Sequence, residues 1–129
     1  MIDDAAKRKI LGLAGLGIRG RLAVVGVQQA RDAAKRGRLK LALVANDASQ
    51  NSLDKVASLL SAKGVTTLTD FTAAELGAVA GRESVAVIGV SDAGLSRGIL
   101  AAVAGRDSEV EVAVAAQAIR HSGRRDSRR

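Results

Sequence analysis

Short apolar runs rich in β-branched residues alternate with segments of helical periodicity along most of the chain. Four such runs are predicted strands, because they have strand length and end at turn-forming residues. Between them, apolar residues recur three and four positions apart, as on one face of a helix. The alternation predicts an α/β fold, a three-layer α-β-α sandwich around a mixed sheet of about four strands. The predicted strands are Leu22–Val25, Leu39–Ala45, Val65–Thr69 and Val85–Val90.

Five helices are predicted from apolar spacing and from capping residues. Hydroxyl and carboxylate side chains can accept hydrogen bonds from the free N–H groups of a first helical turn, and glycine often follows the last turn. Thr72 and Glu75 have the spacing of a capping box. The predicted helices are Asp4–Gly15, which glycines end; Val27–Arg36, which Gly37 ends; one capped by Asn51 or Ser52, with Leu53, Val56, Ala57 and Leu60 inward and Gly64 at its end; one from Thr72 to Gly81; and one capped by Ser91 or Asp92.

Leu39–Ala45 is almost continuously apolar. Such a run is typical of a strand buried on both faces, so we expect it at the centre of the sheet. Glu109–Ile119 fits two structures, because its valines alternate as in a strand and also share one face of a helix.

Composition indicates one domain with a closely packed core. The chain has 129 residues, of which 47% are hydrophobic, enough for a single core. Phe71 is the only aromatic residue, so the core must be built from aliphatic side chains with helices lying close to the sheet. We expect one α/β domain over residues 1–119 and a basic, disordered tail over residues 120–129.

The chain lacks the residues that several classes of function require. There is no cysteine, and the one histidine, His121, lies in the basic tail, so a zinc enzyme is not expected. The carboxylates occur singly at turns and helix starts, where capping explains them, and no acid/base pair can be named. No apolar run reaches the roughly 20 residues that cross a bilayer, and no signal segment follows the first residues. We therefore predict no catalytic residues, metal, cofactor or membrane contact, and a cytoplasmic location.

Positive charge is concentrated in two segments. The chain has a net charge of +7, and residues 18–40 contribute seven bases against Asp32 alone. The tail from Arg120 holds five arginines against Asp126, whereas residues 41–119 are acidic overall, with five bases and nine acids. Such a concentration of basic residues next to a helix start indicates a nucleic-acid-binding patch more often than an accidental cluster.

The sequence Gly15-Leu-Gly17-Ile-Arg-Gly20 has the GxGxxG spacing of a dinucleotide-binding turn. That turn connects a strand to the start of a helix and is followed by an acidic residue roughly 20 positions on. Here the glycines follow a predicted helix and precede a strand, and the later region reads Leu39, Lys40, Leu41. A loop that ends the helix is the favoured interpretation over a nucleotide site.

The segment Val24–Ser49 resembles the kink-turn-binding ribosomal proteins of the L-seven-Ae superfamily. It has a strand ending in Gly26, a polar helix start, a Lys-Arg-Gly stop, a basic link and a buried strand that ends in Ala-Asn-Asp-Ala. Ala74–Gly81 is similar to the Glu-Leu-Gly helix of that superfamily, and Ile10–Val103 is most similar to its bacterial YlxQ-like members. The resemblance implies the same fold and an RNA partner.

The resemblance also implies an RNA-binding site at the start of the Gly26–Arg36 helix. The base-reading pattern of the superfamily falls on Gly26, Val27, Gln28, Gln29 and Asp32, and only the glycine is retained. The two glutamines keep amide groups able to contact base edges, whereas Asp32 places an anion where the superfamily has a lysine. The alternative for Asp32 is an ion pair with Arg36 on a solvated helix face.

The second contact of the superfamily maps to the loop Ala80–Val85, where Arg82 would meet phosphate and Val85 would pack on a base. Phosphate contacts are also expected from the basic side chains of the first segment. These are Arg31, Lys35, Arg36 and Arg38.

The predicted function is therefore non-catalytic binding of structured RNA, with ribosomal and kink-turn-like RNA as candidates. Near-absence of aromatic residues disfavours single-strand binding by base stacking. One alternative is a protein-interaction module of the same fold that has lost specific RNA readout, which Asp32 would suit. Another is a nucleotide-dependent enzyme, which would require Gly15–Gly20 to lead into a helix.

Overall fold

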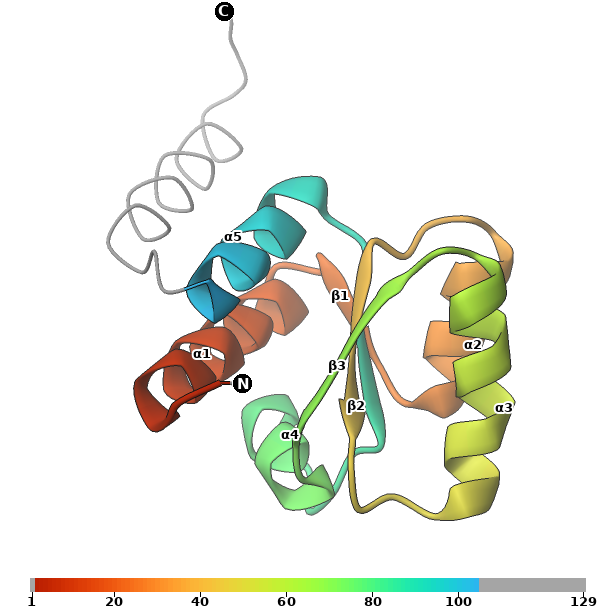
Figure 1. The fold of residues 1–129 in the computed structure, drawn as a ribbon, viewed down its shortest axis with the longest axis horizontal. Helices are drawn as coiled ribbons and strands as arrows, with labels where there is room; N and C mark the ends of the chain where they lie inside the picture. The colour runs from red at the N-terminus through yellow and green to blue at the C-terminus, as the bar shows by residue number, and fades with distance from the viewer. Residues whose placement is uncertain (1, 105–129) are drawn as a thin grey trace, which may run out of the picture.

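The computed structural model describes residues 2–104, in which a four-stranded sheet lies between two layers of helices (Figure 1). The strand order is β1-β4-β2-β3. β2 and β3 are parallel, while β4 is antiparallel to both of its neighbours, β1 and β2. The strands are β1 (Ala23–Val25), β2 (Leu41–Ala45), β3 (Thr66–Phe71) and β4 (Val87–Val90).

Three helices cover one face of the sheet and two cover the other, which confirms the predicted sandwich with a mixed sheet (Figure 1). α1, α4 and α5 form one layer, and α2 and α3 pack side by side in the second. The segments 109–119 and 120–129 lie outside the described residues. The helices are α1 (Asp4–Arg19), α2 (Val27–Lys35), α3 (Gln50–Ala62), α4 (Ala73–Ala80) and α5 (Ala93–Val103).

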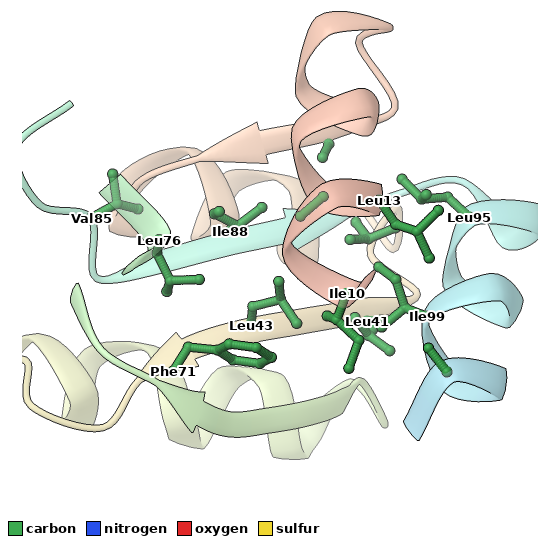
Figure 2. Close-up of a cluster of buried hydrophobic side chains, with 14 of the residues drawn as sticks. Ile10, Leu13, Leu41, Leu43, Phe71, Leu76, Val85, Ile88, Leu95 and Ile99 are labelled. Atoms are coloured by element: carbon green, nitrogen blue, oxygen red, sulfur yellow. The ribbon is translucent and has the colours of Figure 1, made fainter. Parts of the chain in front are cut away.

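β2 is a central strand, as its apolar sequence predicts, and all five of its residues are buried. Leu41 and Leu43 join the core under α1, α4 and α5, which also holds the single aromatic residue, Phe71 (Figure 2). Ala42 and Val44 face the other way into the core under α2 and α3. The alternation of side chains along one strand thus supplies both cores.

α1 is longer than predicted, because its glycines are packing positions and not a helix stop. The helix continues through Gly15 and Gly17, both buried, and ends with Gly20 as C-cap. A Cβ on Gly17 would collide with the side chain of Leu95 on α5. Glycine therefore allows α1 to approach α5 closely, which a core poor in large side chains requires.

α3 also differs from its prediction. It begins at Gln50, so Asn51 and Ser52 lie in its first turn and are not caps. Val56 and Leu60 are buried as expected, but Ala57 is exposed. The capping predictions for α4 and α5 are confirmed, since Thr72 and Glu75 form a capping box and Asp92 accepts a hydrogen bond from the Leu95 N–H at 2.8 Å.

The two ends of the sheet carry different elements. β1, β2 and β3 run in one direction and β4 runs against them. α2, α3 and α4 therefore begin at the end of the sheet where β1, β2 and β3 finish and β4 starts, which we call the carboxyl end. α1, α2 and α3 finish at the opposite end, which we call the amino end (Figure 1).

Candidate nucleic-acid interface

The start of α2 is fixed next to the start of β4. Gly26 connects β1 to α2 with a φ of 102°, a conformation that favours glycine. Its N–H donates to the carbonyl of Val87 at 2.8 Å, and its carbonyl accepts from the Ala30 N–H at 3.0 Å. The first turn of α2 and the chain leading into β4 are thereby neighbours at the carboxyl end of the sheet.

The start of α2 has no capping side chain. Gly26 offers none, and the first turn contains no acidic residue. In contrast, side chains of Asp3, Thr72 and Asp92 accept hydrogen bonds at the starts of α1, α4 and α5. The first N–H groups of a helix have no partner inside the helix and carry its positive dipole end. At α2 these donors are open to an acceptor from outside.

Gln28 and Asp32 form a pair on the surface of α2. The Gln28 Nε2 donates to the Asp32 Oδ1 at 3.0 Å, one helical turn away. The predicted ion pair between Asp32 and Arg36 is absent from the described residues. Because a carboxylate only accepts hydrogen bonds, Asp32 fixes which end of the Gln28 amide faces it and leaves the amide oxygen free. Gln29 is exposed beside it.

The loop between α4 and β4 lies at the same end of the sheet and rests on Gly77. The Arg82 N–H donates to the Gly77 carbonyl at 2.8 Å. A Cβ on Gly77 would lie 2.7 Å from both the Arg82 carbonyl oxygen and the Ser84 Cα, so only glycine fits beneath this loop. The side chains of Arg82, Glu83 and Ser84 are exposed.

Val85 does not offer a surface to a base, contrary to its prediction. Its side chain is only 5% exposed and packs in the core with Leu76 and Ile88 (Figure 2). Its N–H donates to the carbonyl of Ala73 at 3.0 Å, which fixes the strand entry. The part of the loop that can contact a ligand is therefore Arg82–Ser84.

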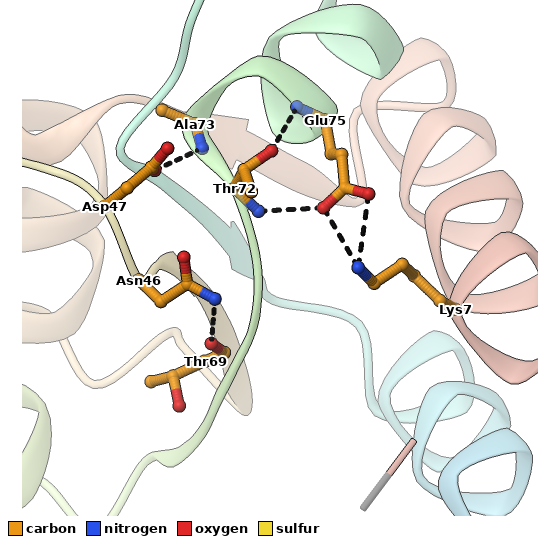
Figure 3. A network of polar contacts seen from close by, with 7 residues as sticks. All are labelled: Lys7, Asn46, Asp47, Thr69, Thr72, Ala73 and Glu75. Atoms are coloured by element: carbon orange, nitrogen blue, oxygen red, sulfur yellow. Dashed lines mark hydrogen bonds and ion pairs between the residues drawn. The ribbon is translucent and has the colours of Figure 1, made fainter. Parts of the chain in front are cut away.

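A polar network anchors α4, and through it the loop (Figure 3). The Lys7 Nζ lies 3.2 Å from each carboxylate oxygen of Glu75, which also accepts from the Thr72 N–H at 2.9 Å. The hydrogen bond from the Thr72 N–H, together with the Lys7 ammonium, holds the pKa of Glu75 below its usual value, although burial acts in the opposite direction. Asp47, in the turn after β2, accepts from the Ala73 N–H at 2.7 Å.

The basic residues of the first charged segment do not form one patch at this site. Arg31, half-buried, and Lys35, exposed, lie along the outer face of α2, and the buried Nε of Arg31 has no partner within residues 2–104. Arg36 and Arg38 come after the last turn. Because nine helical residues span about 12 Å, these two arginines lie at the amino end of the sheet, away from Gly26. The predicted single patch is therefore divided.

The remaining predicted sites can be assessed within residues 2–104. Gly15–Gly20 leads from a helix into β1, so it lacks the strand-to-helix geometry of a dinucleotide-binding turn. That part of the chain holds no group of three potential metal ligands among its histidine and acidic residues. Nor does it contain a helix of the length and apolar character that crossing a bilayer requires.

Two contributors to the site were not predicted from the residues. Asp47 was expected only to cap a turn, whereas it accepts from the first N–H of α4, 26 positions along the chain. Gly77 enters the prediction only as part of the Glu-Leu-Gly resemblance. Its position in the sequence does not show that the backbone of the loop Arg82–Ser84 packs directly against it. A signal for the first lies in the strand order, because adjacent parallel strands bring the segments after β2 and β3 together.

The fold and the site define a small α-β-α sandwich domain with an uncapped helix start beside a glycine-supported loop. Residues 18–100 match the sequence model of the ribosomal protein L7Ae/L30e/S12e/Gadd45 family. The chain belongs to that family.

Two solved structures illustrate the likeness. A protein of unknown function from Bacillus halodurans has a TM-score of 0.67 and 29% sequence identity, over 73% of this chain and 95% of that one. The Giardia lamblia 15.5 kD RNA-binding protein has a TM-score of 0.63 and 19% identity, over 88% of this chain and 93% of that one. No curated protein matches the chain.

Proposed function

We propose that this protein binds structured RNA without catalysing a reaction, using the start of α2 and the loop Arg82–Ser84. One observation carries the proposal: the hydrogen bond from the Gly26 N–H to the Val87 carbonyl joins an uncapped helix start to the first residue of β4, into which the exposed loop Arg82–Ser84 leads. Membership of the family and the likeness to an RNA-binding protein from Giardia lamblia support an RNA ligand. Kink-turn and ribosomal RNA are the candidates.

The residues at the site have different roles in this proposal. The open N–H groups of Val27, Gln28 and Gln29 meet acceptors on phosphates or bases, where the helix dipole favours negative charge. The free amide oxygen of Gln28 accepts from base amino groups, and Gln29 offers both a donor and an acceptor.

Phosphate contacts in this proposal come from basic side chains of α2 and of the loop. Arg31 and Lys35 lie along the outer face of α2, and Arg82 extends from the loop. Asp32 and Glu83 lie among them, so the site is close to neutral and its contribution is hydrogen bonding more than net attraction.

Folded RNA suits this surface better than an unpaired strand. Proteins that bind single strands without sequence preference stack bases on exposed aromatic side chains. The only aromatic residue of this chain, Phe71, is fully buried in the core. Recognition then depends on the shape of the RNA and on hydrogen bonds to its groups.

A protein-interaction module is the second candidate, and the acidic side chains of this end favour it. Asp32, Asp47 and Glu83 lie in or next to the site and oppose the approach of phosphate. A protein partner that offers hydrogen-bond donors to these carboxylates could bind there.

A binding titration separates the two functions. The full chain is titrated with a kink-turn RNA and with a plain duplex of equal length, at two salt concentrations. We expect tighter binding of the kink-turn RNA, and we expect Gln28→Ala with Gln29→Ala to remove most of that preference. Equal binding of the two RNAs by the unmodified protein would refute specific readout, and no binding of either would favour the protein-interaction module.

The chain offers a matched control for this variant. Gln50 on α3 donates to Asp54 at 2.8 Å, the same glutamine–aspartate pair one turn apart as on α2. Gln50→Ala removes the equivalent side-chain hydrogen bond and should leave the preference for the kink-turn RNA unchanged.

A further inference from the structure

Five exposed basic residues lie in the turns and links between elements at the amino end of the sheet. The first residues of β1, β2 and β3 and the last residue of β4 lie in one registered row, in which Ala23 and Leu41 each pair with Val90, and Leu41 pairs with Thr66. Basic residues lie shortly before the first residue of β1, β2 and β3, the three strands that run in the same direction. Since neighbouring strands are about 4.8 Å apart, the row is roughly 14 Å wide. The five residues, which we call the basic rim, are Arg21, Arg36, Arg38, Lys40 and Lys63.

The backbone holds the rim in place. The Lys40 N–H donates to the Val90 carbonyl at 2.8 Å, and the Ser91 N–H donates to the Leu22 carbonyl at 2.9 Å. Arg21 and Lys40 are thus adjacent to β4 on its two sides. The Arg38 N–H donates to Ala33 at 2.9 Å, which fixes the turn after α2.

The rim side chains are uncompensated within residues 2–104. None of the five makes a side-chain hydrogen bond or ion pair in that range, whereas Lys7 is paired with Glu75. The nearest acid of the amino end, Asp92, is engaged as the cap of α5. Five positive charges against one anion make this end the more positive of the two.

Stabilisation of helix ends does not account for the whole rim. Cations near a helix carboxyl terminus are favourable, but the effect falls off within the last turn. Arg21, Arg38 and Lys40 lie past the last turns of α1 and α2. Arg21 has a φ of 62°, in the left-handed region that glycine adopts in the turns at Gly37 and Gly64. Arg21 therefore occupies a position where its backbone is strained, which points to a function of its side chain.

We propose that the basic rim is a second RNA-binding surface, which contacts the phosphate backbone of a duplex segment. The start of α2 is at the other end of the sheet, so the two surfaces can hold two segments of one folded RNA. A duplex carries closely spaced phosphates along both strands. A row of exposed basic side chains can contact these phosphates without reading the base sequence. This goes beyond the proposed function, because the rim can bind a duplex whether or not the α2 start reads a motif.

The test compares two charge-matched pairs of substitutions in the full chain, titrated with a plain RNA duplex at several salt concentrations. Arg21→Gln with Arg38→Gln alters the rim. Arg8→Gln with Lys55→Gln removes the same charge from exposed positions on α1 and α3. We expect the rim pair to lower duplex affinity about fivefold to tenfold and the slope of log K against log salt by about 2. The control pair should change both far less.

Equal effects of the two pairs would overturn the proposal, because affinity would then follow net charge alone. No effect of the rim pair would also overturn it. An acidic protein surface would then be the favoured partner of the rim. Lys40→Gln with Lys63→Gln is the second rim variant, should the first not fold. Loss of duplex affinity in rim variants that still prefer the kink-turn RNA would separate this surface from the α2 start, so the two proposals fail independently.

Discussion

At the scale of single residues, glycine determines where the backbone can approach closely. Gly77 lies under the loop Arg82–Ser84, and Gly17 lies against Leu95. Both are buried helical positions, where glycine has a cost in chain entropy that close packing offsets. Neither contact can be inferred from the residue alone, since the partner is on another element.

Gly77→Ala should destabilise the fold by about 1–3 kcal/mol, because its Cβ would meet backbone atoms of the loop that cannot rotate away. Gly12→Ala is the control at an exposed helical position with nothing within 4 Å. It should stabilise by about 0.5–1 kcal/mol. Denaturant unfolding of both variants measures this, and equal effects of the two would contradict the close approach at Gly77.

Asp32 is the residue whose surroundings differ most from the sequence-based expectation. Its carboxylate accepts from Gln28 and is not paired with Arg36, because side-chain direction on a helix brings several partners within reach at the same spacing. Val85 was likewise assigned to the RNA surface, whereas its side chain is buried in the core under α1, α4 and α5. Sequence spacing therefore does not show which way the side chains of Asp32 and Val85 point.

Asp32→Asn should raise RNA affinity about twofold to fivefold, since it removes an anion from the site while keeping an acceptor for Gln28. The measurement is an RNA titration at low and moderate salt. Asp54→Asn, which alters the equivalent pair on α3, is the control. An unchanged affinity for Asp32→Asn would show that RNA does not approach this face of α2.

At the scale of elements, the helix starts were the most predictable feature. Thr72 with Glu75, and Asp92, cap the helices that their positions indicate, because capping depends on residues within one turn. The end of α1 and the start of α3 were predicted less well. The continuation of α1 through Gly15 and Gly17 depends on packing against α4 and α5, and no local pattern contains that information.

The start of α4 should make stability depend on pH. The pKa of Glu75 is lowered in the folded state, so its stabilisation is present above the unfolded value of 4.5 and is lost as the pH falls through the lower folded value. Glu75→Gln should therefore destabilise at pH 7, and the difference from the unmodified protein should shrink towards pH 3.

Thermal unfolding across this pH range measures the effect. Glu83→Gln serves as the control, because Glu83 is an exposed carboxylate with no hydrogen bond or ion pair within residues 2–104. A constant difference between Glu75→Gln and the unmodified protein from pH 7 to pH 3 would contradict the role given to the Lys7–Glu75–Thr72 network.

At the scale of the whole molecule, alternating strands and helices predicted the sandwich, and the apolar run Leu39–Ala45 predicted its central strand. Charge was different. Residues 18–40 are continuous in sequence, yet they extend from one end of the sheet to the other and back, so one basic segment becomes two surfaces. Strand direction decides this, and composition does not.

Backbone hydrogen exchange of the full chain, with and without a bound kink-turn RNA, tests RNA binding at the α2 start most directly. The first N–H groups of α2 lack a capping acceptor and should exchange quickly in the free protein. Bound RNA should slow exchange at residues 27–29 and 83–84 together. Unchanged exchange at both segments in a protein saturated with RNA would show that the RNA binds elsewhere.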